Sequence, residues 1–154
     1  MSGSCRPGLV VLASLMWAAA LASAAAGRQD VQGAAGKISV WDGVYSESQA
    51  SRGLEEFTRS CERCHGADLT GNATDEVPAL VADNFMFHWG RRPLQDLYER
   101  IRKTMPADAP GALAATVYLD IVAYLLEANG FPRGPRDLDR NQLSAILIEK
   151  AASR

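Results

Sequence analysis

The stretch Cys61-Glu62-Arg63-Cys64-His65 limits the choice of fold more than any other part of the sequence. Its two cysteines, two residues apart on one turn, can reach the two vinyl groups along one edge of a haem and form thioethers. The adjacent histidine then presents its imidazole to the iron. The motif predicts one covalently bound haem c, attached through Cys61 and Cys64, with His65 as an axial iron ligand. An apolar cofactor at the centre helps a chain of this size to form a core.

Two other interpretations of the paired cysteines are less well supported by the sequence. A thioredoxin-like redox pair or a disulfide would need a βαβ context, and the chain has no strand signal. A zinc site would need four nitrogen or sulfur ligands, and the candidates Cys61, Cys64, His65 and His88 are poorly spaced for one. The third cysteine, Cys5, lies in a segment that we expect to be removed.

The N-terminus has the three parts of a secretory signal peptide. Arg6 and Pro7 precede an uncharged run over 9–26, which ends in small residues with A-x-A cleavage sites. We expect residues 1–26 to be cleaved off near Ala25 or Gly27 on export to the periplasm. The run, roughly 18 residues long, could also serve as an uncleaved membrane anchor. Its Ala-rich second half inserts weakly, which favours cleavage.

The sequence after the signal peptide opens with an irregular leader over 27–43, rich in Gly, Ala and Gln. A first helix is predicted from Ser46, because Ser46 and Gln49 form a capping-box pattern. Its apolar face runs straight into Cys61 and consists of Ala50, Leu54 and Phe57.

Two further helices and a tail complete the prediction. Residues 66–83 have loop composition, and a helix opens at Pro93 and is ended by Met105-Pro106. The most strongly periodic segment is the helix over 116–129. The C-terminal extension, 132–154, is expected to add one short amphipathic helix. Since no segment reads as a strand, the predicted fold class is all-α.

The second axial ligand of the iron is chosen among Met86, His88 and Met105. Met105 follows a helix and precedes Pro106, so an irregular backbone can present its thioether, and we favour it. Met86 and His88 lie in an apolar cluster, 84–89, that is typical of core packing. They remain the alternatives, together with an open site.

These motifs resemble those of the class I c-type cytochromes over residues 44–131. Gly53 and Phe57 stand where that family has a glycine and an aromatic ahead of its C-x-x-C-H motif. The family's A-Y-L pattern in the last helix is matched by Ala123-Tyr124-Leu125, and its Met-Pro loop by Met105-Pro106. The resemblance implies a small cytochrome c fold of about four to five helices wrapped around one haem.

The resemblance also implies particular contacts. Gly53 would let the first and last helices cross closely, with Tyr124 packed over it. The carbonyl of Pro78 would accept a hydrogen bond from Nδ1 of His65. The residues expected near the haem propionates are Trp89, Arg91 and Arg92.

The stretch over 39–131 looks most like bacterial periplasmic cytochromes that are associated with quinoprotein alcohol or sugar dehydrogenases. This likeness implies an electron carrier rather than an enzyme. It would take single electrons from a periplasmic dehydrogenase or a quinol-oxidising complex and pass them to an oxidase or another cytochrome. An iron bound by both His65 and Met105 leaves no position for a small-molecule substrate.

A different class of function remains open from the sequence. If Met105 is not a ligand, a five-coordinate haem could act as a peroxidase or gas sensor, although no obvious distal acid–base histidine is present. A Met–iron charge-transfer band in the oxidised protein would separate the two. The net charge of −2 provides no basic field for nucleic acid, which excludes that class of partner.

Overall fold

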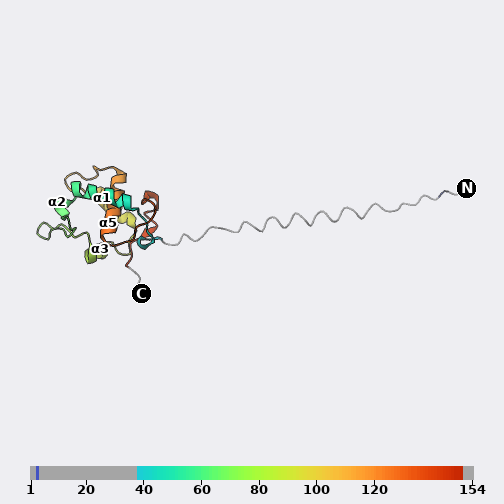
Figure 1. Ribbon diagram of the computed structural model, residues 1–154, viewed down its shortest axis with the longest axis horizontal. Helices are drawn as coiled ribbons and strands as arrows, with labels where there is room; N and C mark the ends of the chain where they lie inside the picture. Colours follow the sequence, from blue (N-terminus) through green and yellow to red (C-terminus); the bar gives the residue numbers. More distant parts are fainter. Residues whose placement is uncertain (1–2, 4–37, 151–154) are drawn as a thin grey trace. The chain divides into compact units, whose positions relative to one another are not determined.

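The computed structural model describes residue 3 and residues 38–150 (Figure 1). The predicted signal peptide, apart from residue 3, and the leader up to residue 37 lie outside the described residues. Within the part of the chain that is described, no helix has the length and apolar character needed to cross a bilayer.

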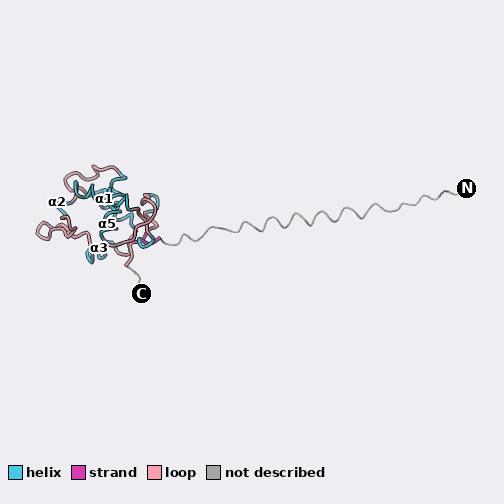
Figure 2. Tube along the Cα trace, viewed as in Figure 1, coloured by secondary structure: helices cyan, strands magenta, loops and turns pink. Residues whose placement is uncertain are grey.

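The predicted all-α fold with four to five helices is confirmed (Figure 2). The elements in chain order are β1 (Ile38–Ser39), η1 (Val40–Asp42), α1 (Glu47–Ser60), α2 (Glu62–His65), α3 (Ala82–Trp89), α4 (Leu94–Thr104), α5 (Ala115–Ala128), η2 (Arg140–Gln142) and β2 (Ile146–Leu147). The two strands pair in parallel, with Ile38 opposite Ile146. Strands of two residues are too short to produce an alternating pattern, so the sequence did not reveal them.

Helix α1 begins as predicted, but its capping residues act differently. The Ser46 hydroxyl accepts the Gln49 backbone N–H at 3.1 Å. The Gln49 side chain is only 2% exposed and bonds both backbone groups of Leu138, accepting its N–H at 2.6 Å. Gln49 therefore fixes the C-terminal segment against α1 instead of completing a capping box. Leu54, expected on the buried face, is 45% exposed.

The buried position next to Leu54 is taken by Gly53, at the crossing of α1 and α5. These two helices form the most extensive contact between elements of the fold. A Cβ atom on Gly53 would lie 1.9 Å from the Asp120 carbonyl oxygen and 2.8 Å from the Tyr124 Cβ. The predicted close crossing, with Tyr124 against Gly53, is therefore confirmed. The ring of Phe57, one turn further along α1, packs 5.2 Å from that of Tyr124.

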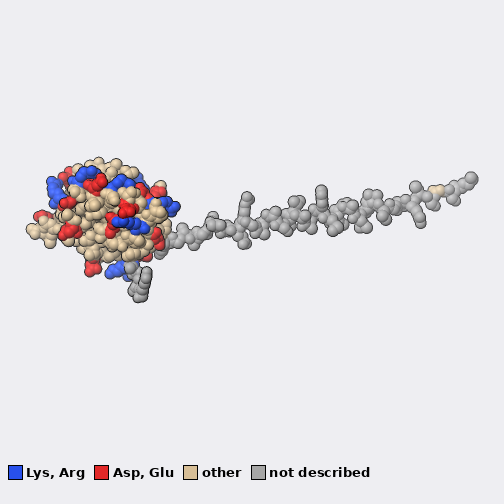
Figure 3. Space-filling model, in the orientation of Figure 1, with Lys and Arg blue, Asp and Glu red and all other residues tan. Residues whose placement is uncertain are grey.

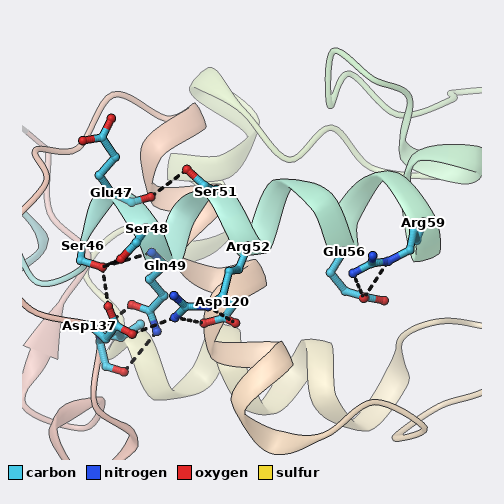
Figure 4. Close-up of polar contacts among 11 residues, drawn as sticks. Ser46, Glu47, Ser48, Gln49, Ser51, Arg52, Glu56, Arg59, Asp120 and Asp137 are labelled. Carbon is cyan, nitrogen blue, oxygen red and sulfur yellow. Dashed lines mark hydrogen bonds and ion pairs between the residues drawn. The ribbon is translucent and has the colours of Figure 1, made fainter.

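Polar side chains join α1 to α5 and to the C-terminal segment (Figure 4). Arg52 donates to both carboxylate oxygens of Asp120, at 3.0 and 3.1 Å, and to Asp137 at 2.7 Å. Asp137 also accepts from the Ser46 hydroxyl, and that bond and Arg52 together lower the pKa of its carboxyl. Since these groups are partly exposed, the network specifies how the segments meet more than it stabilises the fold.

The prediction of an amphipathic helix in the C-terminal extension is wrong for the residues described. The segment up to residue 150 holds η2 and β2, and its apolar side chains Leu138, Leu143, Ile146 and Ile148 are buried. Its backbone bonds other parts of the chain: Ile148 donates to the Arg92 carbonyl at 3.0 Å and accepts from Arg91 at 2.6 Å. Because the backbone groups find partners outside the segment, it needs no helix to satisfy them.

Helix α3 lies in the aromatic cluster that we expected to be core. A helix distributes adjacent residues around its axis, so Phe85 is buried while Phe87 is 83% exposed and His88 is exposed. The core-packing prediction thus holds for Phe85 and is wrong for Phe87 and His88.

We predict that Gly53→Ala will destabilise the protein although alanine favours helix. The added Cβ would collide with backbone at Asp120, which cannot rotate away. Overpacking of this kind costs about 1–3 kcal/mol. Urea unfolding should show this loss for Gly53→Ala and almost none for Glu55→Ala, an exposed site on the same helix. Equal stability of Gly53→Ala and wild type would contradict the crossing.

A second prediction concerns Tyr45, whose buried hydroxyl donates to the Phe131 carbonyl at 2.6 Å. Burial, assisted by the charge of Glu127, raises the pKa of Tyr45 from 10.0 to about 12. Below pH 10 its contribution to stability is constant. Between pH 10 and 12 only the unfolded chain loses the proton, so stability falls by up to about 1.4 kcal/mol per pH unit. Urea unfolding at pH 9 and 11 should show a larger loss for wild type than for Tyr45→Phe.

Candidate haem-binding site

A cavity of about 530 Å³ opens among the helices, within the size range of cofactor pockets. Its walls are mainly apolar and come from all five α-helices and the loop after α2. The apolar lining residues are Phe57, Pro78, Ala79, Leu80, Phe85, Leu97, Ile101, Ile121 and Leu125. The lining also includes Cys61, His65, His88 and Met105, so residues that can attach a haem and bind its iron share one cavity.

The end of α1 and the short α2 place the cysteine motif at this cavity. Cys61 ends α1, donating to the Phe57 carbonyl at 2.8 Å, and its own carbonyl accepts the His65 N–H at 3.0 Å. The structure brings Cys61 and His65 to the cavity wall, whereas Cys64 is exposed and does not line it. Cys61 and Cys64 form no disulfide with each other. Burial, reinforced by Glu56 and Cys64, raises the pKa of Cys61 to about 11, unlike the low pKa of reactive thiols.

His65 is 7% exposed, and its imidazole is oriented by the loop that follows. Its Nδ1 lies 3.4 Å from the carbonyl oxygen of Pro78, the contact implied by the family resemblance. A carbonyl can only accept, so this contact selects the tautomer with the proton on Nδ1 and leaves Nε2 free to bind a metal. Burial lowers the pKa of His65 and so favours the neutral imidazole. The hydrogen bond to Pro78 acts in the opposite direction, and the effect of burial is the larger one.

Gly71 makes this loop geometry accessible, and the sequence analysis did not identify it. Gly71 has a φ of +70°, and a Cβ there would lie 2.3 Å from the Val77 carbonyl oxygen and 2.7 Å from that of Pro78. Its N–H donates to the His65 carbonyl at 2.9 Å. Only glycine fits both the left-handed backbone and the close approach. A glycine in a Gly-Asn loop was the available signal.

Of the three candidates for the second axial ligand, two line the cavity and one does not. Met105 lies at the end of α4, where its N–H donates to the Ile101 carbonyl at 2.8 Å, and its side chain lines the cavity. His88 also lines the cavity, with its ring packed edge-on against Phe87 at 5.1 Å. Met86 is not among the lining residues. The geometry therefore keeps Met105 and His88 as candidates.

Cationic side chains contribute to the lining of the cavity. Arg92 and Trp89, which we expect near the haem propionates, both line it, with the Arg92 guanidinium 5.3 Å from the centre of the Trp89 ring and 2.8 Å from the Asp96 carboxylate. Arg91 does not line it and bonds Ile148 through its backbone. Arg100 lines the cavity as well and was not singled out from the sequence. Such cations can offset the carboxylates of a haem within an otherwise apolar site.

These residue types fit a haem and fit other metal sites poorly. The Cys61 thiol, a neutral imidazole and a thioether residue line one apolar cavity of suitable volume, and Cys64 lies next to it in the chain segment of Cys61 and His65. Among residues 38–150, no group of three or more His, Cys, Asp or Glu side chains is arranged to hold a metal ion. The zinc alternative therefore has no support in this part of the chain.

Comparisons with known proteins agree with the geometry. Residues 48–125 match the family model described as cytochrome c oxidase, cbb3-type, subunit III. A solved structure, the sulfane dehydrogenase SoxCD from Paracoccus pantotrophus, has a chain with a similar fold, with a TM-score of 0.50 and 21% identity. The match covers 70% of this chain and 61% of that one. No curated protein matches. Because the family model spans half of the chain, this protein belongs to that family of cytochrome c domains and carries a covalently bound haem c.

Proposed function

We propose that the protein is an exported electron carrier whose haem iron is bound by His65 and Met105. The observation that carries the proposal is that both side chains line one apolar cavity, next to the cysteine motif. When bound there, the haem supplies an iron that gains and loses one electron. The protein's own residues attach the haem, hold the two ligands in place and exclude water.

Each residue has a defined task in this proposal. Cys61 and Cys64 form the thioethers, and the neutral His65 binds through Nε2 while Pro78 fixes its ring. Met105 would supply the second iron ligand, and with both ligand positions occupied no small-molecule substrate would reach the iron. A thioether ligand and an apolar wall both favour Fe(II) and thereby raise the reduction potential.

The partners that we propose are other redox proteins. The name of the family model refers to an oxidase, and the similar solved structure is a dehydrogenase. Oxidases accept electrons and dehydrogenases donate them, so both names are compatible with redox-protein partners. We propose a periplasmic dehydrogenase as donor, a quinoprotein among them, and an oxidase or another cytochrome as acceptor. The visible face of the protein carries interspersed positive and negative side chains (Figure 3), so docking there would depend on local complementarity.

A five-coordinate haem protein, acting as a peroxidase or gas sensor, is the second candidate. Its specific support is His88, which lines the cavity from α3 and is exposed. That function requires Met105 to stay off the iron. The ligation state of the oxidised protein therefore decides between an electron carrier and a haem that binds small molecules.

We predict that Met105→Ala will open one axial position of the iron. The Met–iron charge-transfer band should disappear, and the reduced protein should bind carbon monoxide readily. The potential should fall, by on the order of 0.1 V within the roughly 0.8 V range that axial ligands span. The control His88→Ala should keep the wild-type spectrum. If Met105→Ala retains the band and stays inert to carbon monoxide while His88→Ala does not, His88 is the ligand and the assignment is wrong.

Export and cleavage give a further prediction. We propose that residues 1–26 are removed in the periplasm and that residues 44–131 form the cytochrome domain. Intact-mass measurement of the exported protein should show loss of the signal peptide and the added mass of one haem. A full-length, membrane-bound chain would establish the anchor instead.

A further inference from the structure

We infer that Tyr118 is a positioning residue for the Met105 loop, which controls how readily the iron can exchange its second axial ligand. The inference rests on the proposed function, because it takes Met105 as that ligand. Tyr118 lies in the first turn of α5, is buried, and does not line the cavity. Its role is carried by its hydroxyl group.

The hydroxyl of Tyr118 joins both ends of the loop between α4 and α5. It donates to the Met105 carbonyl oxygen at 2.9 Å and accepts the Leu113 N–H at 3.4 Å. Met105 begins the loop and Leu113 lies just before α5. The Tyr118 hydroxyl oxygen therefore links the first residue of the loop, Met105, to Leu113 near its end.

The remaining backbone bonds of the loop are local, and its one other side-chain link to a helix, within the part of the chain that the structure describes, is the exposed ion pair of Asp108 with Arg63 of α2, at 3.0 Å. Ala109 donates to the Pro106 carbonyl at 3.0 Å and Ala112 to that of Ala109 at 3.2 Å, both within the loop. Gly111 donates to the Met105 carbonyl at 3.4 Å, a longer contact from the loop itself. These bonds shape the loop but do not hold it to α5. The Tyr118 hydroxyl provides that connection, so it restrains the backbone of Met105, a residue that lines the cavity.

Tyr118 also belongs to the helix that forms the cavity wall. Ile121 and Leu125 line the cavity, one and two turns further along α5. The same rigid helix thus presents apolar side chains to the cofactor and a hydroxyl to the ligand loop. Because α5 packs closely against α1, the hydrogen bond from Tyr118 ties the backbone of Met105 to the core of the protein.

The test compares Tyr118→Phe with Tyr45→Phe in the haem-loaded protein. Both changes remove a buried hydroxyl that donates to a backbone carbonyl, but Tyr45 bonds Phe131 and does not contact the Met105 loop. Carbon monoxide binding to the reduced protein measures how often the iron loses Met105. We expect Tyr118→Phe to raise its rate about tenfold, the factor that corresponds to about 1.4 kcal/mol. The charge-transfer band should weaken as well.

Tyr45→Phe should lower thermal stability yet leave carbon monoxide binding and the band at their wild-type values. If Tyr118→Phe binds carbon monoxide no faster than Tyr45→Phe does, the positioning role is overturned. Met105→Ala is measured beside them. Wild-type behaviour of Met105→Ala would refute the ligand assignment, whereas a changed Met105→Ala with an unchanged Tyr118→Phe refutes the role of Tyr118 alone.

A second substitution covers the case in which Tyr118→Phe does not fold. Replacing Tyr118 by 3-fluorotyrosine keeps the ring and makes the phenol a stronger donor to the Met105 carbonyl. This protein should bind carbon monoxide more slowly than wild type and retain the band. An unchanged or faster rate would count against the inference.

Discussion

The close approach of α1 to α5 at Gly53 is the contact on which the remaining structure depends. Without a side chain at Gly53, the backbone of α1 rests against Asp120 and Tyr124 of α5. The same helix α1, two turns further on, ends at Ser60 and leads directly into Cys61 and α2. On α5, Ile121 and Leu125 line the cavity. One missing side chain thus sets the separation between the attachment motif and the opposite apolar wall.

In the haem-binding site, backbone carbonyl groups of loop residues form hydrogen bonds with side chains of helices. Pro78 orients His65 with a carbonyl, and the Met105 carbonyl accepts the Tyr118 hydroxyl. Gly71 permits the first contact because any side chain there would meet Val77 and Pro78. Loops can place ligands reproducibly in this fold because their backbones bond to residues held by helices.

Short motifs and helical periodicity were sufficient to predict much of this architecture. The start of α1 and the extent of α4 and α5 followed from local residue patterns. The Gly53 crossing and the contact between His65 and Pro78 followed from the resemblance to the class I c-type cytochromes. The C-terminal segment was predicted wrongly because its apolar residues are buried by pairing with Arg91 and Arg92, which lie far away in sequence. Non-local backbone partners leave no periodic signal. The same reason hid the turned-in Gln49 and the role of Tyr118, whereas Gly71 acts within its own loop.

The parallel pairing of β1 with β2 places the two ends of the described domain beside each other. Ile38 is opposite Ile146, and the indole of Trp41 donates to the Glu149 carbonyl at 2.8 Å. Because the pair is parallel, a peptide that joins residue 150 to residue 38 must run back along it, and a connection of about a dozen residues could close the chain. A circular permutant reopened at an exposed turn, such as the one after Asn72, would keep every helix and its neighbours. The new chain ends would then lie at that turn, so the domain could be fused to other proteins there while the packing of the haem motif, α4 and α5 stays the same.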